Sequence, residues 1–211
     1  MKDNSGAQVL GRTSWKRLGI VMVPTVVAAG ALTVAMANGA IAASFAVSGQ
    51  QFKLTADEIH GYGFVNYGTV LNADQPNAKA GAIPAAISAF KTATITNLCQ
   101  SVVTTLPVIG AVTLTIKAGA GDTPVSATDL TIAMQQLNAG TATFTDINIG
   151  QDASTLSGSA TGAVGTPGLF GQQATEAVLD KVQQVANSTN AGSFELHDMS
   201  MGISIGNNPC F

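Results

Sequence analysis

Apolar and polar residues alternate strictly along several segments of this chain. In residues 112–117 every second residue is valine, leucine or isoleucine, and the residues between them are threonine or lysine. This period of two is typical of a β-strand that buries one face. The pattern returns in residues 130–134 and 199–205. Segments rich in threonine, valine, isoleucine and alanine predict further strands at 51–56, 64–71, 92–103 and 141–149.

These strands predict a mainly β fold, with a curved or stacked antiparallel sheet that forms a β-sandwich, an open barrel or a solenoid-like stack. A weak sequence repeat favours stacked strands. Three segments begin with aspartate and then alternate apolar and polar residues: Asp129-Leu-Thr-Ile, Asp146-Ile-Asn-Ile and Asp198-Met-Ser-Met. Short matches in so simple a composition also arise without repetition. Phe194 and Leu196 are out of phase with residues 199–205, which predicts a bulge near His197 and Asp198.

One segment has the spacing of an amphipathic helix. In residues 172–187, Ala174, Val178, Val182 and Val185 would lie on one stripe, with the charged residues away from it. We therefore expect one late helix. The preceding residues, 150–171, are mostly glycine, serine, threonine and alanine, and they predict a long flexible loop.

The N-terminal segment has the parts of a secretory leader. Arg12, Lys16 and Arg17 precede an apolar stretch at residues 18–43. That stretch contains two patterns suited to a signal peptidase, Ala35-Met36-Ala37 and Ala40-Ile41-Ala42. The basic residues keep the N-terminus on the cytoplasmic side, so the remainder faces outward.

The apolar stretch is longer than in most leaders and approaches the length of a membrane span. Residues 1–43 are therefore either a cleaved signal peptide, which we favour, or an N-terminal anchor helix that holds the protein at a membrane. In both cases residues 44–211 form a single β-rich domain. We expect this domain to be secreted or to lie on the extracytoplasmic face of the cell envelope.

Charge is scarce and one-sided in this domain. Residues 44–211 contain 5 lysines, no arginine and 11 acidic residues, hence a net charge of −6. A nucleic-acid partner is not expected, because that affinity rests mainly on basic side chains. The whole chain has 10% charged residues and a mean hydropathy of +0.31. Either the fold buries most of its apolar surface, or part of that surface meets a ligand, a membrane or a partner.

Two cysteines, Cys99 and Cys210, lie in the exported part. An even pair outside the cytoplasm predicts a disulfide, and two separate buried thiols are the alternative. The two cysteines and two histidines lack the spacing of a zinc site, so we expect no metal. No dinucleotide or phosphate-binding motif occurs, and no cofactor is expected.

A hydrolase motif, G-x-S-x-G, occurs once, at Gly202-Ile203-Ser204-Ile205-Gly206. Only five residues follow it, without a histidine, which excludes an ordinary α/β-hydrolase. A triad of Ser204 with His197 and Asp198 would need a fold-back of the chain, because a straight strand separates Ser204 from His197 by roughly 20 Å. The simpler interpretation is an exposed serine on a strand.

The second histidine, His60, follows Asp57 and Glu58, which could pair with it as acid or base. A solvated turn beside a strand explains the same residues more simply. The nearby Gly61-Tyr62-Gly63 is too common a pattern to indicate a phosphate loop.

The chain resembles a family of small exported actinobacterial proteins of unknown function. The similarity includes Trp15-Lys16-Arg17 in the leader, the stretch from Phe52-Lys53-Leu54-Thr55-Ala56-Asp57 to Gly61-Tyr62-Gly63-Phe64, and the late cysteine. Some relatives carry the label cholesterol esterase, so the resemblance implies a possible sterol-ester hydrolase but assigns no catalytic residue.

Three functions are therefore compatible with the sequence. The first is binding of a lipid or sterol-like molecule on a β-sheet, which the apolar composition and the export favour. The second is a structural, self-associating component of the envelope. The third is an esterase that acts on cholesteryl or fatty-acid esters through Ser204.

Overall fold

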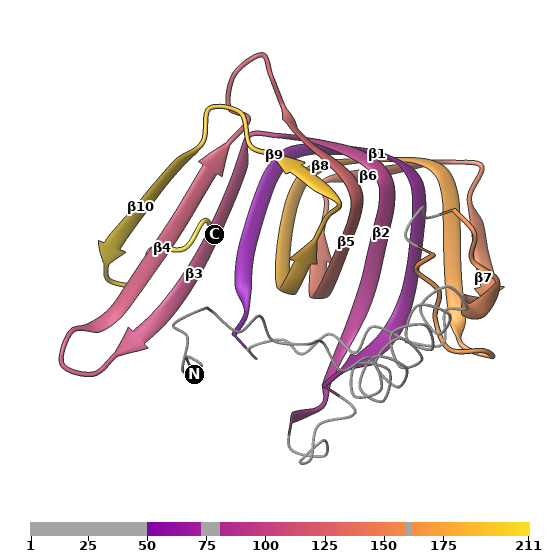
Figure 1. Ribbon diagram of the computed structural model, residues 1–211, viewed down its shortest axis with the longest axis horizontal. Coiled ribbons are helices and arrows are strands. Elements are labelled where there is room, and N and C mark those ends of the chain that lie inside the picture. Colours follow the sequence, from indigo (N-terminus) through magenta and orange to yellow (C-terminus); the bar gives the residue numbers. More distant parts are fainter. Residues whose placement is uncertain (1–49, 73–80, 159–161) are drawn as a thin grey trace, which may run out of the picture. The chain divides into compact units, whose positions relative to one another are not determined.

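The computed structural model describes residues 50–72, 81–158 and 162–211, all of which belong to the unit Phe45–Phe211. These residues form one antiparallel sheet of ten strands, shown in Figure 1. The predicted mainly β, antiparallel fold is confirmed. The strands are β1 (Phe52–Leu71), β2 (Ile83–Thr96), β3 (Leu98–Leu106), β4 (Gly110–Ala118), β5 (Val125–Asn138), β6 (Thr141–Thr145), β7 (Asn148–Asp152), β8 (Phe170–Asn190), β9 (Ser193–Glu195) and β10 (Ser200–Ile205).

Four long strands pair in a closed circuit, which we call the four-stranded core. β1 pairs with β2, β2 with β5, β5 with β8, and β8 again with β1. Their inward side chains form the main hydrophobic cluster, in which Phe90, Ile59 and Leu130 are almost completely buried. Removing one such side chain from water contributes about 1.5–3 kcal/mol to the stability of the fold. This cluster is therefore the main stabilising element of the domain.

A three-stranded extension leaves the four-stranded core beyond Asn97. This residue separates β2 from β3 and has a positive φ of 52°, which turns the chain out of line. β3 pairs with β1 only at residues 99–101, then continues beside β4, and β4 pairs with β10 at the edge of the sheet. Figure 1 shows β3, β4 and β10 side by side, with the β3–β4 connection at their free end.

The predicted helix at residues 172–187 is wrong, since this segment lies within strand β8. From residue 174 to residue 182 the buried positions are Ala174, Ala177, Leu179 and Val182, so two of these three intervals are three residues long. One of them contains Lys181, whose φ is 52°. Irregularities of this kind shift the order of inward and outward side chains along a strand by one residue, so that the buried positions have the three-residue spacing of a helix. The predicted N-terminal helix lies outside the described residues.

The aspartates of the weak sequence repeat share one backbone conformation. Asp129, Asp146 and Asp198 have φ values of 51°, 52° and 52°, in the left-handed region that aspartate tolerates better than most residues. The strands that contain or follow them, β5, β7 and β10, do not pair with one another. The weak sequence repeat therefore does not come from stacked strands. At Asp198 the irregularity separates β9 from β10, where a bulge was predicted.

The predicted loop at 150–171 is partly ordered by local contacts. Its first residues belong to β7 and to a short 3-10 helix, Ala153–Thr155. The Asp152 carboxylate accepts hydrogen bonds from the backbone nitrogens of Ser154 at 2.9 Å and Gly168 at 2.8 Å, and these lower the pKa of Asp152. Ala153 and Leu156 pack on Val65 and Ala89, so this segment covers the outer side of β1 and β2.

Candidate functional site

The three-stranded extension has one face made almost entirely of apolar side chains. Residues directly paired across an antiparallel sheet lie on the same face. Ile203 of β10 pairs with Leu114 of β4, and Leu114 pairs with Val102 of β3. We call this the apolar face, and define it as Val102, Val112, Leu114, Ile116, Met201, Ile203 and Ile205.

The apolar face continues the inner face of the four-stranded core. Leu54 of β1, a buried core residue, pairs with Gln100 of β3, and Gln100 pairs with Ile116 of β4. Over the core this face is covered by the other strands of the circuit. Over the extension it is open along β10, where 58% of Met201, 75% of Ile203 and 77% of Ile205 is exposed. Its residues on β3 and β4 are half-buried.

The opposite face of the extension is polar, and residues 206–211 cover part of it on β3 and β4. Thr113 is completely buried beneath residues 206–211; its hydroxyl donates to the carbonyl of Gly206 at 2.7 Å and accepts from the backbone nitrogen of Asn208 at 3.0 Å. The backbone nitrogen of Cys210 donates to the Ser101 hydroxyl at 2.9 Å. The fold thus buries threonine and serine here and leaves isoleucine exposed, the reverse of the usual arrangement.

A disulfide holds the covering segment in place. Cys99 and Cys210 are bonded with an S–S distance of 2.03 Å, which confirms the predicted bridge. Beside it, the Lys53 ammonium donates to the backbone oxygen of Phe211 at 2.8 Å and lies 4.6 Å from the centre of its ring. The open apolar face is therefore carried by a rigidly fastened sheet.

Ser204 lies on the polar face, opposite the apolar face of the same strand. It borders an open groove of about 590 Å³ between β4, β10 and residues 208–210. Its strand, β10, pairs with β4 in an unbroken register from Ser200 to Ile205. No fold-back brings His197 to Ser204 along this strand.

His197 and Asp198 lie in the turn before β10. The carbonyl of His197 accepts from the backbone nitrogen of Gly119 at 2.7 Å, and its ring nitrogen Nε2 is 3.8 Å from a carboxylate oxygen of Glu195. The structure therefore does not assemble Ser204, His197 and Asp198 into a triad, and a hydrolytic role for them stays a prediction.

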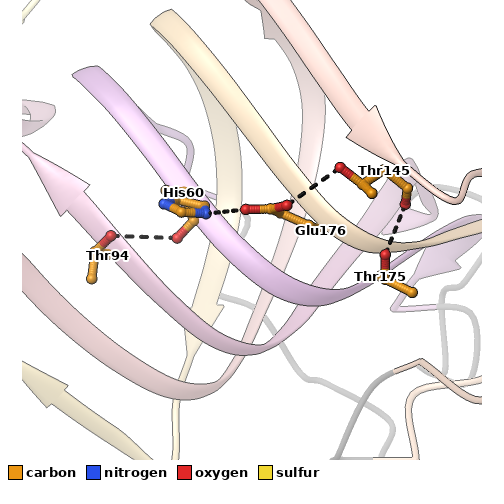
Figure 2. Close-up of polar contacts among 5 residues, drawn as sticks. All are labelled: His60, Thr94, Thr145, Thr175 and Glu176. Atoms are coloured by element: carbon orange, nitrogen blue, oxygen red, sulfur yellow. Dashed lines mark hydrogen bonds and ion pairs between the residues drawn. The ribbon is translucent and has the colours of Figure 1, made fainter.

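His60 belongs to a polar cluster on the outer side of the sheet (Figure 2). It lies within strand β1, and its Nε2 is 2.6 Å from a carboxylate oxygen of Glu176 on β8. The other carboxylate oxygen of Glu176 accepts from the Thr145 hydroxyl of β6 at 3.3 Å. The hydrogen bond from His60 is the main cause that lowers the pKa of Glu176, and the Thr145 hydroxyl acts in the same direction.

Sequence reasoning missed Glu176 as the partner of His60. Asp57 and Glu58 were the expected partners, but Asp57 instead accepts a hydrogen bond from the Asn97 side chain at 3.0 Å. Glu176 was assigned to a helix, so no pattern placed it beside β1. The hydrogen bonds drawn in Figure 2 join His60 and Glu176 to threonine residues, and none of them involves a cysteine or serine nucleophile.

The described residues contain no group of three or more histidine, cysteine or acidic side chains able to hold a metal ion. Within the same residues, no helix has the length and apolar character needed to cross a bilayer.

Comparison with known proteins identifies a family. No curated protein and no solved structure matches the chain significantly. Residues 48–211 match the family described as a family of unknown function (DUF6230), and this match covers most of the chain. It includes every described strand, the disulfide and the apolar face. The chain therefore belongs to the DUF6230 family.

Proposed function

We propose that this protein is an exported component of the cell envelope that binds a lipid or sterol-like molecule on the apolar face. The observation that carries the proposal is the exposure of Met201, Ile203 and Ile205 at the edge of a sheet that buries Ser101 and Thr113 on its opposite face. Contiguous apolar surface of this kind typically marks a binding site.

Rigidity of the extension supports binding rather than loose packing. The disulfide and the hydrogen bonds of Thr113 hold residues 206–211 against the polar face. This segment is therefore not free to move to the other side of the sheet and cover the apolar face. A preformed apolar surface loses little conformational entropy when a ligand binds. The disulfide also fits an oxidising compartment, as export requires.

The charge distribution favours an uncharged ligand. Residues 98–116 and 199–211, which supply the apolar face, contain no lysine, arginine, aspartate or glutamate. An anionic head group would therefore find no cationic partner on the apolar face, because Lys117 of β4 pairs with Cys99 and Ser200 on the opposite face. A sterol, a sterol ester or an acyl chain matches this surface because its recognition rests on apolar contact.

The test is an equilibrium titration of the purified full chain with the fluorescent sterol dehydroergosterol. Ile203→Asp places a charge on the apolar face and should weaken binding by about tenfold or more, the equivalent of about 1.4 kcal/mol. Ser200→Asp is the matched control, since it adds the same charge to the polar face of the same strand. Equal affinities of the two variants would contradict the proposal.

The same preparation tests the enzymatic alternative. The wild type and Ser204→Ala are incubated with a cholesteryl ester, and the released sterol is quantified. We expect the ester to be retained without turnover. Turnover by the wild type that Ser204→Ala abolishes would make the protein a hydrolase, and defined oligomers that exclude sterol would favour a structural component.

A further inference from the structure

The connection between β3 and β4 is an uncharged apolar tip. Leu106, Pro107, Val108 and Ile109 form it, and Val108 is fully exposed while Ile109 is 57% exposed. The nearest charged residue along either strand is Lys117, at the opposite end of β4. Nine residues of strand rise roughly 30 Å, so the tip and Lys117 lie far apart.

Val108 is poorly suited to its position in two ways. Its φ is 75°, a left-handed conformation that a β-branched residue adopts only with strain. Its side chain also contacts too little of the described structure to be shielded from solvent. Glycine or asparagine would serve this turn better. Valine therefore gives the folded protein no advantage at this turn in water. Contact with an apolar environment outside the molecule would explain why an apolar residue stands here.

The tip also stands clear of the four-stranded core. β3 pairs with β1 only as far as Ser101, and beyond that point the paired neighbours of the β3–β4 hairpin are its own two strands and β10. The tip joins the apolar face through Val112 of β4, which pairs with Thr104 next to the Leu106–Gly110 pair at the hairpin end. The tip can therefore contact a flat apolar surface while Lys117, at the other end of β4, stays away from it.

We propose that residues 106–109 insert into the surface of a lipid bilayer and dock the domain there, with a preference for zwitterionic lipids. The absence of basic residues on the tip and the net charge of −6 for residues 44–211 give no attraction to anionic head groups. Insertion instead removes Leu106, Val108 and Ile109 from water. This proposal does not depend on ligand binding by the apolar face.

A local probe tests it in the full chain, because the apolar leader could bind vesicles by itself. Val108→Cys is labelled with an environment-sensitive fluorophore and mixed with phosphatidylcholine vesicles. We expect a blue shift and brighter emission, unchanged by added salt. The control is the same label at Thr123→Cys, exposed in the loop at the other end of β4, which should not respond.

A second arm separates insertion from folding. With the fluorophore at Leu106→Cys, a tip residue that is also exposed, Val108→Asn/Ile109→Asn should reduce the response of the probe to vesicles by about tenfold. The variant should fold at least as stably because asparagine suits a positive φ. Ile147→Asn/Ile149→Asn is the matched control, with two exposed isoleucines elsewhere. An unchanged probe response in the tip variant, a probe response that needs anionic lipid, or a tip-dependent dimer without any probe response would each overturn the proposal.

Discussion

Single residues show why the Gly61-Tyr62-Gly63 pattern exists. A Cβ atom on Gly61 would lie 2.3 Å from Cδ1 of Phe90, the ring at the centre of the core. Gly63 has a φ of 66°, and a Cβ there would lie 2.4 Å from the carbonyl oxygen of Gly158. Both glycines permit close packing, and no phosphate-binding role is needed to explain them.

Gly61→Ala should therefore destabilise the domain by about 1–3 kcal/mol, the range for overpacking a buried site. Denaturant unfolding of the full chain measures the change. Gly68→Ala is the matched control in the same strand, since a Cβ there would contact nothing within 4 Å. Equal stability of the two variants would mean that Phe90 does not pack against Gly61.

The Glu176 carboxylate makes a pH-dependent contribution to stability. Its pKa is lowered in the folded protein, chiefly by the hydrogen bond from His60. A lowered pKa means that the contribution is present above the usual value of 4.5 and is lost as the pH falls through the lower folded-state pKa.

Glu176→Gln should consequently lower the Tm at neutral pH, with a difference from the wild type that shrinks as the pH falls below 4.5. The size is small because the carboxylate is well solvated. Thermal unfolding of both proteins between pH 3 and pH 7 measures it. A constant Tm difference over this range would contradict the role of His60.

At the scale of elements, strands could be predicted wherever the alternation is unbroken. Residues 112–117 and 199–205 correspond closely to β4 and β10. β8 was missed because intervals of three residues between buried positions reproduce the spacing of a helix. His60 was placed in a turn for a related reason: two predicted strands, 51–56 and 64–71, are parts of the single strand β1, whose centre is rich in charge and glycine.

The disulfide acts on one element, the segment that covers the polar face. Replacement of both Cys99 and Cys210 by serine should destabilise the domain by about 2–5 kcal/mol, because the bridge spans a large loop in the unfolded chain. It should also expose residues 206–211 to protease. Unfolding with and without reductant measures the first effect, and limited proteolysis measures the second. A segment that stays protected in the double variant would show that its hydrogen bonds alone suffice.

At the scale of the whole molecule, the sequence allowed an exposed apolar surface but did not show its position. Composition left two alternatives: a fold that buries most of its apolar surface, or an apolar surface that meets a ligand, a membrane or a partner. The alternation showed which residues of each strand share a face. Pairing of β10 with β4 joins residues 83 to 93 positions apart, from Ser200 with Lys117 to Ile205 with Val112. No local pattern contains that information, so the apolar face emerged only from the topology.

Local sequence patterns also could not predict where residues 206–211 lie on the sheet. An alternating strand is expected to bury its apolar side, yet residues 206–211 cover the polar side of β4. Only the bridge between Cys99 and Cys210 pointed to this arrangement, since it fastens the end of the described chain to the middle of the sheet.

The most direct measurement is photo-crosslinking of the full chain with a photoactivatable cholesterol analogue, followed by mass spectrometry of the adducts. The account predicts adducts on the apolar face, on peptides that contain Leu114 or Ile203, and their loss in Ile203→Asp. Adducts confined to residues 18–43, or found equally in Ile203→Asp, would contradict the claim that this face binds the ligand.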